Sequence, residues 1–541
     1  MTLMSGTEPR VTIVMTARER HSLAEAAIEA IVAETPRPYR FIYLDIDSPA
    51  WLRRVFTSRA AEWALEVVRM DGCLWPHQAR VRIIESIATP YTVFIDNDVD
   101  VGPGWLEPLV ACADATGAGI VGPLYLTGDG VQAARIHMAG GRLVRSDDPD
   151  GLVLDEAHVL ADEDPRRVAD QLRRQPCDFV EYHCMLIRTE LLRAGVLDPR
   201  ITCVHEHIDT SLTAGRLGFE TYIEPAARVS YLGDSEYMLE DLPVFRSRWQ
   251  RADADASIAA FCRKWGVVDD ERSFGGVRRF LADHVADVDP IRPALRDHPD
   301  HRVAMAAHEL GQTRSALLDL ALERGYVRDE LALLANAYHL AHILMDGGYR
   351  PCGRPFINHL VGTASVLVRY GFRAETVAAG LLHSAYTHCP IDAAGGQPVG
   401  EAVCAALGGR GSPLERRVRA YTLREQRAPG ADVEPADLST LSVLEAEIIA
   451  MTAANELDMY LSGEFRHSGR TDTIPQRACE QIAKVCELLA VDGLYAALRR
   501  EQQRAASIPA EFITGRPFSY RIGQDKRTAV PMAGDVRAVL P

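Results

Sequence analysis

Short apolar runs alternate with helix-length amphipathic segments along the first hundred residues. Runs at 11–15, 41–47, 65–70 and 91–100 have the length of buried strands, and a capping-box pattern beginning at Ser22 opens one of the helical segments between them. Strands joined by helices predict a parallel sheet. Two of the runs end in acidic residues, and ligands of such sheets bind beyond the carboxyl ends of the strands. The pattern therefore predicts an α/β domain with a binding site at that edge.

Helical periodicity replaces this pattern in the second half of the chain. Apolar residues recur three and four positions apart over 305–335, 358–370, 374–386, 441–460 and 473–489. A polar, proline-containing stretch at 287–302 precedes these segments and marks a domain boundary. The second half is therefore expected to form an all-α domain.

The predicted division of the chain follows from these changes in pattern. The parts are an α/β domain over 1–275, a linker over 276–305, an all-α domain over 306–506 and an irregular tail over 507–541. Within the first domain, the Asp-, Pro- and Arg-rich segment 145–175 is expected to be an exposed excursion.

Amino-acid composition and net charge limit the kind of protein that this chain can be and the kind of partner that it can bind. With 541 residues, 47% hydrophobic and 25% charged, the chain is a multidomain globular protein. A formal charge of −16 argues against a nucleic-acid partner but leaves room for a nucleotide sugar. Eleven dispersed cysteines without a C-x-x-C pair are typical of reduced thiols. No run approaches the roughly eighteen apolar residues of a membrane span, and no signal-peptide pattern opens the chain, so a cytoplasmic location is expected.

The strand-end sequence Asp96-Asn97-Asp98 is the sharpest chemical feature. Two carboxylates on alternate residues can hold one divalent cation, which would neutralise a departing diphosphate. Taken alone, a D-x-D sequence is more often a solvated turn. Its context is what favours a metal site.

That context resembles the family 2 glycosyltransferases of the GT-A fold. The matching segments are VTIVMTARER, FIYLDIDSP, the Gln-Ala-Arg that ends at Arg80, FIDNDVDVGPGWLEPL and EHIDTSLTAGRLGFETYIEP, in the family's order over roughly residues 10–270. The resemblance implies a GT-A, Rossmann-like domain that transfers a sugar, as a hexosyltransferase does, from a nucleotide-diphosphate donor with Mg²⁺ or Mn²⁺. The resemblance implies direct displacement with inversion at the anomeric carbon, and retention stays open as the alternative.

Site residues follow from the resemblance position by position. Thr16, Arg18 and Asp45 correspond to the positions that hold the base and ribose. Arg80 corresponds to a position near the diphosphate, and Asp96 and Asp98 correspond to the carboxylates that hold the metal and the sugar nucleotide. The block Glu206-His207-Ile208-Asp209 corresponds to the E-D-x-D motif that supplies the general base. Because His207 stands where the family has the base, Glu206, His207 and Asp209 all remain candidates, and Asp209 is equally suited to capping a helix.

The sequence departs from the family at the late metal ligand. The family's histidine is missing from the segment that begins at Arg228. His183 is a candidate contact to sugar or metal, although a core histidine is the commoner outcome. Trp75, His77 and Trp105 are candidates for ligand contacts, with Trp105 better suited to packing.

The segment 354–388 resembles the HD superfamily of helical phosphohydrolases, nearest the stringent-response nucleotide hydrolases and HD-related domains of unknown function. His359 and His383 match the histidine ligands, but Ser384 and Asn455 replace the two metal-binding aspartates. Loss of both carboxylates weakens a hydrolytic metal centre. The residues of a surviving candidate site are His359, His383, His388 and Asp458.

The function predicted from the sequence is a glycosyltransferase with an unidentified acceptor. Two alternatives stay open: a phosphohydrolase driven by the second domain, and a non-catalytic nucleotide-sensing scaffold. The intact Asp96 and Asp98 count against the scaffold, and Ser384 and Asn455 count against the hydrolase. The donor, the acceptor and the oligomeric state are not written in the sequence.

Overall fold

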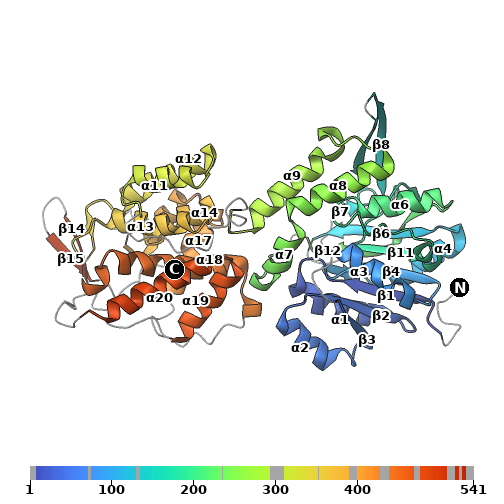
Figure 1. Cartoon of the computed structure of the whole chain (residues 1–541), viewed down its shortest axis with the longest axis horizontal. Helices are drawn as coiled ribbons and strands as arrows, with labels where there is room; N and C mark the ends of the chain where they lie inside the picture. Colours follow the sequence, from blue (N-terminus) through green and yellow to red (C-terminus); the bar gives the residue numbers. More distant parts are fainter. Residues whose placement is uncertain are drawn as a thin grey trace. The chain divides into compact units, whose positions relative to one another are not determined.

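The computed structural model describes most of the chain. The described residues are 8–70, 75–128, 135–149, 151–233, 235–292, 310–350, 352–388, 399–426, 438–467, 476–508, 518–522 and 527–531. The chain divides into two compact units, Met1–Val285 and Ala286–Pro541. In Figure 1 the first unit runs from blue to green and the second from yellow to red.

One mixed β-sheet forms the centre of the first unit. Its strands are β1 (Val11–Thr16), β2 (Arg40–Ile46), β3 (Leu65–Met70), β4 (Tyr91–Asp96), β5 (Val99–Val101), β6 (Ile120–Thr127), β7 (Arg135–Met138), β10 (Gln175–Cys177), β11 (Cys184–Arg188) and β12 (Thr221–Tyr231). Their order is β10-β12-β6-β11-β4-β1-β2-β3, with β5 beside β12 and β7 beside β6. Strands β4, β1, β2 and β3 are parallel, as predicted, and β11 lies antiparallel between β4 and β6.

Helices and one separate hairpin complete the first unit. The helices are α1 (Ala24–Glu34), α2 (Ala50–Arg59), α3 (Pro76–Ile83), α4 (Leu106–Thr116), α5 (Thr189–Arg193), α6 (Glu206–Arg216), α7 (Leu242–Arg248), α8 (Arg251–Trp265) and α9 (Glu271–Val288). The hairpin pairs β8 (Gly141–Asp148) with β9 (Gly151–His158) and occupies part of the predicted excursion. Figure 1 shows it projecting beside α8 and α9.

The packing of β1 against β4 explains why the residues that follow these two strands gather at one edge of the sheet. Every residue of β1 and β4 is buried, which is why both strands read as continuous apolar runs. The last residues of the two strands, Thr16 and Asp96, are partners in the parallel register. The residues that follow both strands therefore leave the same edge of the sheet.

The second unit is helical and carries one small sheet. Its helices are α11 (Arg314–Glu323), α12 (Arg328–Leu344), α13 (Phe356–Arg369), α14 (Ala374–Leu382), α15 (Ala385–His388), α16 (Val399–Ala406), α17 (Pro413–Gln426), α18 (Val443–Leu461), α19 (Gln476–Leu488) and α20 (Asp492–Ala506). The sheet has the order β13 (Gly348–Tyr349), β14 (Phe518–Ile522) and β15 (Arg527–Pro531). A helical unit after the α/β domain agrees with the sequence prediction.

Several boundaries differ from those predicted. Helix α9 continues to Val288 through the start of the predicted linker, whose residues 293–305 lie outside the described part. The predicted helix at 305–335 is two helices, α11 and α12, separated by Gly325 at a positive φ of 76°. Strands β14 and β15 lie within the predicted irregular tail, because they pair with each other and with β13.

Ser22 does not cap a helix as predicted. Its N–H and hydroxyl donate hydrogen bonds of 3.0 and 2.7 Å to the two oxygens of Asp241, and α1 begins at Ala24. A tertiary partner far along the chain thus replaces the local capping bond. None of the described helices is long and apolar enough to cross a membrane.

Candidate active site

Asp96 is surrounded by cationic side chains at the end of β4. Its Oδ1 lies 2.8 Å from Arg80 Nη2, and its Oδ2 lies 3.2 Å from both Arg18 Nη1 and His183 Nδ1. Burial raises the pKa of Asp96, but the His183 hydrogen bond and the charges of Arg18 and Arg80 outweigh it and hold that pKa well below its usual range. The structure therefore brings together three sequence-predicted residues, Arg18, Arg80 and Asp96, with His183.

Asp98 is also fully buried but has fewer partners. Arg20 Nη1 lies 3.4 Å from its Oδ2, and its Oδ1 has no hydrogen-bond partner among the described residues. Burial and the charge of Asp96 raise the pKa of Asp98. Ligand atoms of Asp96, Asp98 and His183 all lie within 4.8 Å of one another. An unpartnered buried carboxylate oxygen in such a group suits a divalent cation, so the predicted metal residues fit a metal.

Asn97, between the two aspartates, fixes the loop that follows β1. Its Oδ1 accepts a 2.7 Å hydrogen bond from the Arg18 N–H, and its Nδ2 donates a 2.7 Å bond to the Arg20 carbonyl. Because the side chain is completely buried, these bonds tie the two strand ends together. The D-x-D sequence here is a packed part of the sheet edge and not a solvated turn.

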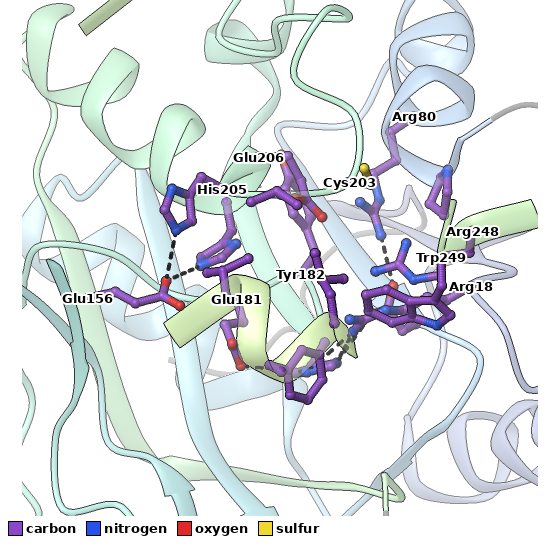
Figure 2. A pocket seen from close by; sticks show the side chains of 18 residues that line it. Arg18, Arg80, Glu156, Glu181, Tyr182, Cys203, His205, Glu206, Arg248 and Trp249 are labelled. Carbon is purple, nitrogen blue, oxygen red and sulfur yellow. Dashed lines mark hydrogen bonds and ion pairs between the residues drawn. The ribbon is translucent and has the colours of Figure 1, made fainter. Parts of the chain in front are cut away.

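A cavity opens beside these residues (Figure 2). Of the sequence-predicted residues, those that line it are Arg18, Arg80, Asp96, Glu206 and His207. Its other walls come from segments far apart in the sequence, which contribute Glu156, Glu181, His183, His205, Arg248, Trp249, Phe280 and further apolar residues of α9. The cavity therefore combines cations and carboxylates with an apolar wall.

Glu206 and His207 begin helix α6 at the cavity. The residue before them, His205, has a φ of 59°, a strained conformation for a side chain of this kind. Burial raises the pKa of Glu206, but the charges of His207, Arg248 and others outweigh it and lower it. Burial lowers the pKa of His207, but the carboxylate of Glu156, 3.5 Å away, outweighs burial and raises that pKa. Glu206 is therefore ionised at neutral pH, whereas protonation of His207 is favoured.

Asp209 points away from this chemistry. Its Oδ1 accepts a 2.7 Å hydrogen bond from the Trp265 indole N–H, and its Oδ2 a 2.9 Å bond from Lys264 Nζ. Side-chain partners on α8 thus occupy both oxygens of a carboxylate with no exposed surface. This geometry gives Asp209 a structural role in joining α6 to α8.

We expect Asp209→Asn to lower stability without affecting turnover. Loss of the charged hydrogen bond to Lys264 is expected to cost about 2 kcal/mol of unfolding free energy. Urea unfolding followed by tryptophan fluorescence measures this cost in the first unit alone, because all six tryptophans lie within residues 1–285. A variant as stable as the wild type that has lost turnover would instead identify Asp209 as the base.

Three of the predicted donor-binding residues do not line the cavity: Asp98, described above, Thr16 and Asp45. Asp45 Oδ1 accepts a 3.0 Å hydrogen bond from the Ser48 N–H, and its Oδ2 lies 3.7 Å from Arg69. Thr16 is fully buried at the end of β1, and its hydroxyl has no hydrogen-bond partner among the described residues. Thr16 is the register partner of Asp96, and Asp45 lies near the end of β2, one strand further from β4.

The sequence did not single out Glu19, which orients part of the cavity wall. This buried carboxylate accepts hydrogen bonds of 3.0 Å from the Tyr237 hydroxyl and 2.8 Å from the Trp249 indole, and lies 3.2 Å from Arg248 Nε and 3.3 Å from Arg20 Nη1. Burial raises the pKa of Glu19, but the neighbouring arginines outweigh it and lower it to about 2. The only sequence signal for Glu19 is its place among arginines just after β1.

His77 and Trp105 are core residues. The Trp105 indole N–H donates a 2.9 Å hydrogen bond to Thr35 Oγ1, and Trp105 is 1% exposed. His77 is completely buried against Tyr182, with ring centroids 5.6 Å apart, and neither of its nitrogens has a partner among the described residues. Burial, assisted by the charge of Arg80, lowers the pKa of His77 to about 4.

This buried neutral histidine predicts a loss of stability in acid. Because the pKa of His77 is lower in the folded than in the unfolded chain, the unfolded state binds the proton first as pH falls from 6.5 to 4. Each pH unit in that window is expected to remove about 1.4 kcal/mol. The measurement is the denaturant midpoint, by tryptophan fluorescence, across this window. His77→Gln should show a shallower decline, and a slope equal to that of the wild type would contradict the assignment.

The candidate residues of the second unit are partly brought together. His359 Nδ1 lies 2.8 Å from Asp458 Oδ2, and the His359 and His383 rings are 5.3 Å apart. Arg354 donates to both oxygens of Asp458, at 2.8 and 3.1 Å. His388 packs against the Phe356 ring instead. Within the described part of this unit, no three potential metal ligands lie within 4.8 Å of one another.

Comparisons with known proteins find a family match within the first unit. Residues 12–195 match the family model described as glycosyl transferase family 2, so the resemblance predicted from the sequence is confirmed for this region. An uncharacterized protein of Sinorhizobium fredii (strain NBRC 101917 / NGR234), y4gI, is 24% identical over 290 residues, which are 49% of this chain and 28% of that protein. The match therefore spans little more than a quarter of that relative's length. A crystal structure of GalNAc-T7 with UDP, GalNAc and Mn²⁺ matches with 17% identity and a TM-score of 0.33, covering 41% of this chain and 43% of that one.

Proposed function

We propose that the first unit transfers a sugar from a nucleotide-diphosphate donor to an acceptor hydroxyl by a single displacement with inversion. The observation that carries this proposal is one cavity, lined in part by the family 2 region, that brings arginines and carboxylates together. Arg18, Arg80 and Arg248 supply the positive charge, and the proposal uses Asp96 and Glu206 of the four carboxylates that line the cavity. Guanidinium groups at a strand edge suit a diphosphate.

The donor is proposed to bind along the ends of β1, β2 and β4. Thr16, Arg18 and Asp45 are assigned to the base and ribose, and Arg80 to the diphosphate. Support comes from the parallel register, which places Thr16 beside Asp96 and β2 beside β1. Arg80 is 1% exposed and held by Asp96 at 2.8 Å, so its charge is fixed before a donor arrives.

Asp96 and Asp98 would hold a Mg²⁺ or Mn²⁺. The buried, unpartnered Oδ1 of Asp98 supports this assignment. When bound, such a cation stabilises the negative charge that develops on the departing diphosphate. Arg20, 3.4 Å from Asp98 Oδ2, holds the other oxygen of this carboxylate.

Glu206 is proposed as the general base. A carboxylate that is ionised at neutral pH accepts the proton of the acceptor hydroxyl as its oxygen attacks the anomeric carbon and the diphosphate leaves. His207 is less suited to this role because its contact with Glu156 favours the protonated form. Asp209 is excluded from the proposal because Lys264 and Trp265 occupy its carboxylate.

The second unit is proposed to be a non-hydrolytic HD-like domain that serves as a scaffold or senses a ligand. Arg354 neutralises Asp458, the one carboxylate among the candidate residues, through two hydrogen bonds. Unlike Asp96, which has Asp98 beside it, Asp458 has no second carboxylate among the candidate residues to help hold a metal.

The test is product identification with UDP-, GDP-, dTDP- and CDP-sugars in the presence of Mn²⁺ or Mg²⁺. Release of a nucleoside diphosphate, with water as a slow acceptor, is expected for one of these donors. Release of a nucleoside monophosphate would assign the activity to a phosphohydrolase, and no release from any donor would favour the scaffold.

A further inference from the structure

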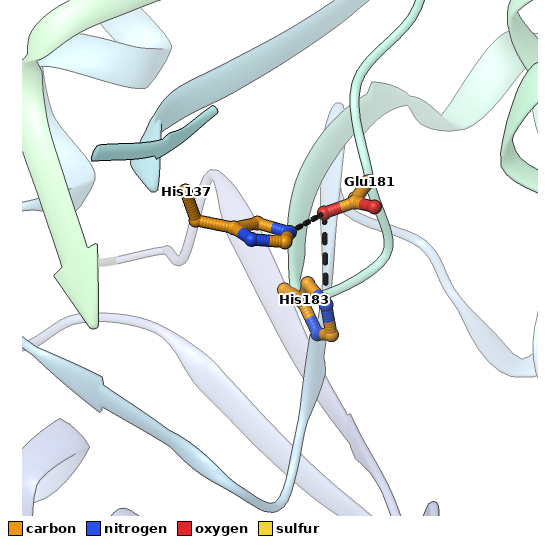
Figure 3. A group of neighbouring side chains, drawn as sticks. All are labelled: His137, Glu181 and His183. Carbon is orange, nitrogen blue, oxygen red and sulfur yellow. Dashed lines mark hydrogen bonds and ion pairs between the residues drawn. The ribbon is translucent and has the colours of Figure 1, made fainter. Parts of the chain in front are cut away.

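Three imidazoles surround one carboxylate on the side of the cavity away from Glu206. Glu181 Oε2 lies 2.8 Å from His137 Nε2 and 3.6 Å from His183 Nε2, as Figure 3 shows, and Glu181 Oε1 lies 3.6 Å from His158 Nε2. The ligand atoms of His137, Glu181 and His183 are all within 4.8 Å of one another. The proposed transfer reaction assigns no role to His137, His158 or Glu181, whereas His183 also belongs to the group that it forms with Asp96 and Asp98.

The backbone that carries two of these residues is held rigidly. The hydroxyl of Tyr125, a fully buried residue of β6, lies 2.9 Å from the Glu181 carbonyl oxygen and 2.7 Å from that of Cys184, and accepts a 3.2 Å bond from the Glu181 N–H. His137 is fixed independently on β7, which pairs with β6. The group is thus arranged before any ligand arrives, as metal sites require.

We propose that His137, Glu181 and His183 bind a zinc ion or a similar late transition metal. Two imidazoles and one carboxylate are a ligand set typical of zinc, whereas Mg²⁺ prefers oxygen ligands. Donor atoms on a tetrahedral zinc lie about 3.3 Å apart, and the 3.6 Å between His183 Nε2 and Glu181 Oε2 is close to that spacing. The 2.8 Å hydrogen bond from His137 is the contact that a metal would replace.

The surroundings of the ligands match those of metal-bound residues. Histidines that bind a metal through one nitrogen generally donate the other N–H to a carboxylate. The carboxylate beside His183 Nδ1 is Asp96, whose Oδ2 lies 3.2 Å away, and Arg18 Nη1 lies 3.1 Å from the same nitrogen. His158 Nε2 lies 3.6 Å from the second oxygen of Glu181. His183 would thus join the zinc group to Asp96, while Asp96 and Asp98 remain with the magnesium or manganese proposed above.

Access to the group is from the cavity and the surface. Glu181 and His183 both line the cavity, and the side chains of His137 and His158 are 24% and 23% exposed. Three protein ligands leave a fourth position, as in catalytic zinc sites. An oxygen of a molecule in the cavity is the ligand that this position would accept.

Metal binding to the full-length protein tests the proposal without any measurement of transfer. Chelator-treated protein in excess Mg²⁺ is titrated with Co²⁺, whose visible absorption reports tetrahedral nitrogen and oxygen ligands, and then with Zn²⁺ in competition. One equivalent is expected to bind. His137→Gln and Glu181→Gln should each weaken binding by at least about tenfold, whereas Asp98→Asn and the distant control His342→Gln should leave it unchanged. Tryptophan fluorescence confirms that each variant is folded.

Two results would overturn the proposal. One is absence of a bound equivalent in the wild type. The other is binding that survives in both His137→Gln and Glu181→Gln, which would place the metal elsewhere. Because Asp98→Asn removes the proposed donor site but not this one, failure of the zinc proposal and failure of the transferase proposal are distinguishable.

Discussion

Glu206→Gln is expected to lower kcat for sugar transfer by about 10²–10⁴ without changing the affinity for nucleoside diphosphate. Glutamine has the shape of glutamate but cannot accept the proton of the acceptor hydroxyl. Helix α6 should still form, because its first turn retains Asp209. Steady-state release of diphosphate from the donor measures kcat, and calorimetry measures the affinity.

His207→Gln is the matched control for this prediction. Its side chain also lines the cavity, on the residue next to Glu206, but contacts Glu156 at 3.5 Å. A clearly smaller loss of kcat is expected for it. A severe loss in His207→Gln combined with near-normal turnover in Glu206→Gln would move the general base to His207.

Asp98→Asn is expected to lower kcat/KM at least about a hundredfold, because loss of an anionic ligand weakens a cation that stabilises the leaving group by several kcal/mol. The variant keeps the size of the buried side chain and removes its charge. Chelation of the divalent cation should reduce wild-type turnover to a similar level, and added Mn²⁺ should restore it only in the wild type.

Asp100→Asn is the matched control, because it removes a carboxylate charge from the same segment of the chain without removing a proposed metal ligand. Asp100 is a half-buried residue of β5, two positions further along the chain, and its side chain is not part of the metal-ligand group. It should respond to Mn²⁺ as the wild type does. Equal losses in Asp98→Asn and Asp100→Asn would indicate damage to the sheet edge and not loss of a metal ligand.

The sheet and the position of its binding edge could be predicted from the sequence because both depend on local pattern. The apolar runs of β1 and β4 are long, continuous and followed by polar residues, so their burial and the placement of Asp96 follow directly. Arg18 lies two residues after the end of β1, and Arg80 lies on α3, the helix before β4. The family motif fixes the order of the two arginines along the chain. Local pattern and motif together were enough to place Arg18, Arg80 and Asp96 at one edge of the sheet, where we propose that the donor binds.

The acceptor side could not be predicted because it depends on contacts between distant segments. Glu156 lies in an acid-rich stretch whose composition indicates an exposed loop, yet the hairpin places it 3.5 Å from His207. Contacts with distant residues then distinguish the three candidate bases: Lys264, 55 residues along the chain, takes up the charge of Asp209, and Glu156 raises the pKa of His207. No spacing rule connects these residues.

The second unit shows the same limit. Its helices follow the predicted periodicity, but the pairing of Arg354 with Asp458 joins residues that are 104 positions apart. The sequence shows which carboxylates are missing from the predicted centre. It does not show that an arginine neutralises the one that remains.

The central claim is a metal-dependent nucleotide-diphosphate site, and thermal unfolding with UDP, GDP, dTDP and CDP, each with and without Mn²⁺, tests it most directly. One diphosphate at a hundred times its dissociation constant should stabilise the first unit by about 2.7 kcal/mol. This stabilisation should need Mn²⁺, persist in Glu206→Gln and vanish in Asp98→Asn. Absence of stabilisation by all four diphosphates, or an Asp98→Asn variant that responds like the wild type, would contradict the claim.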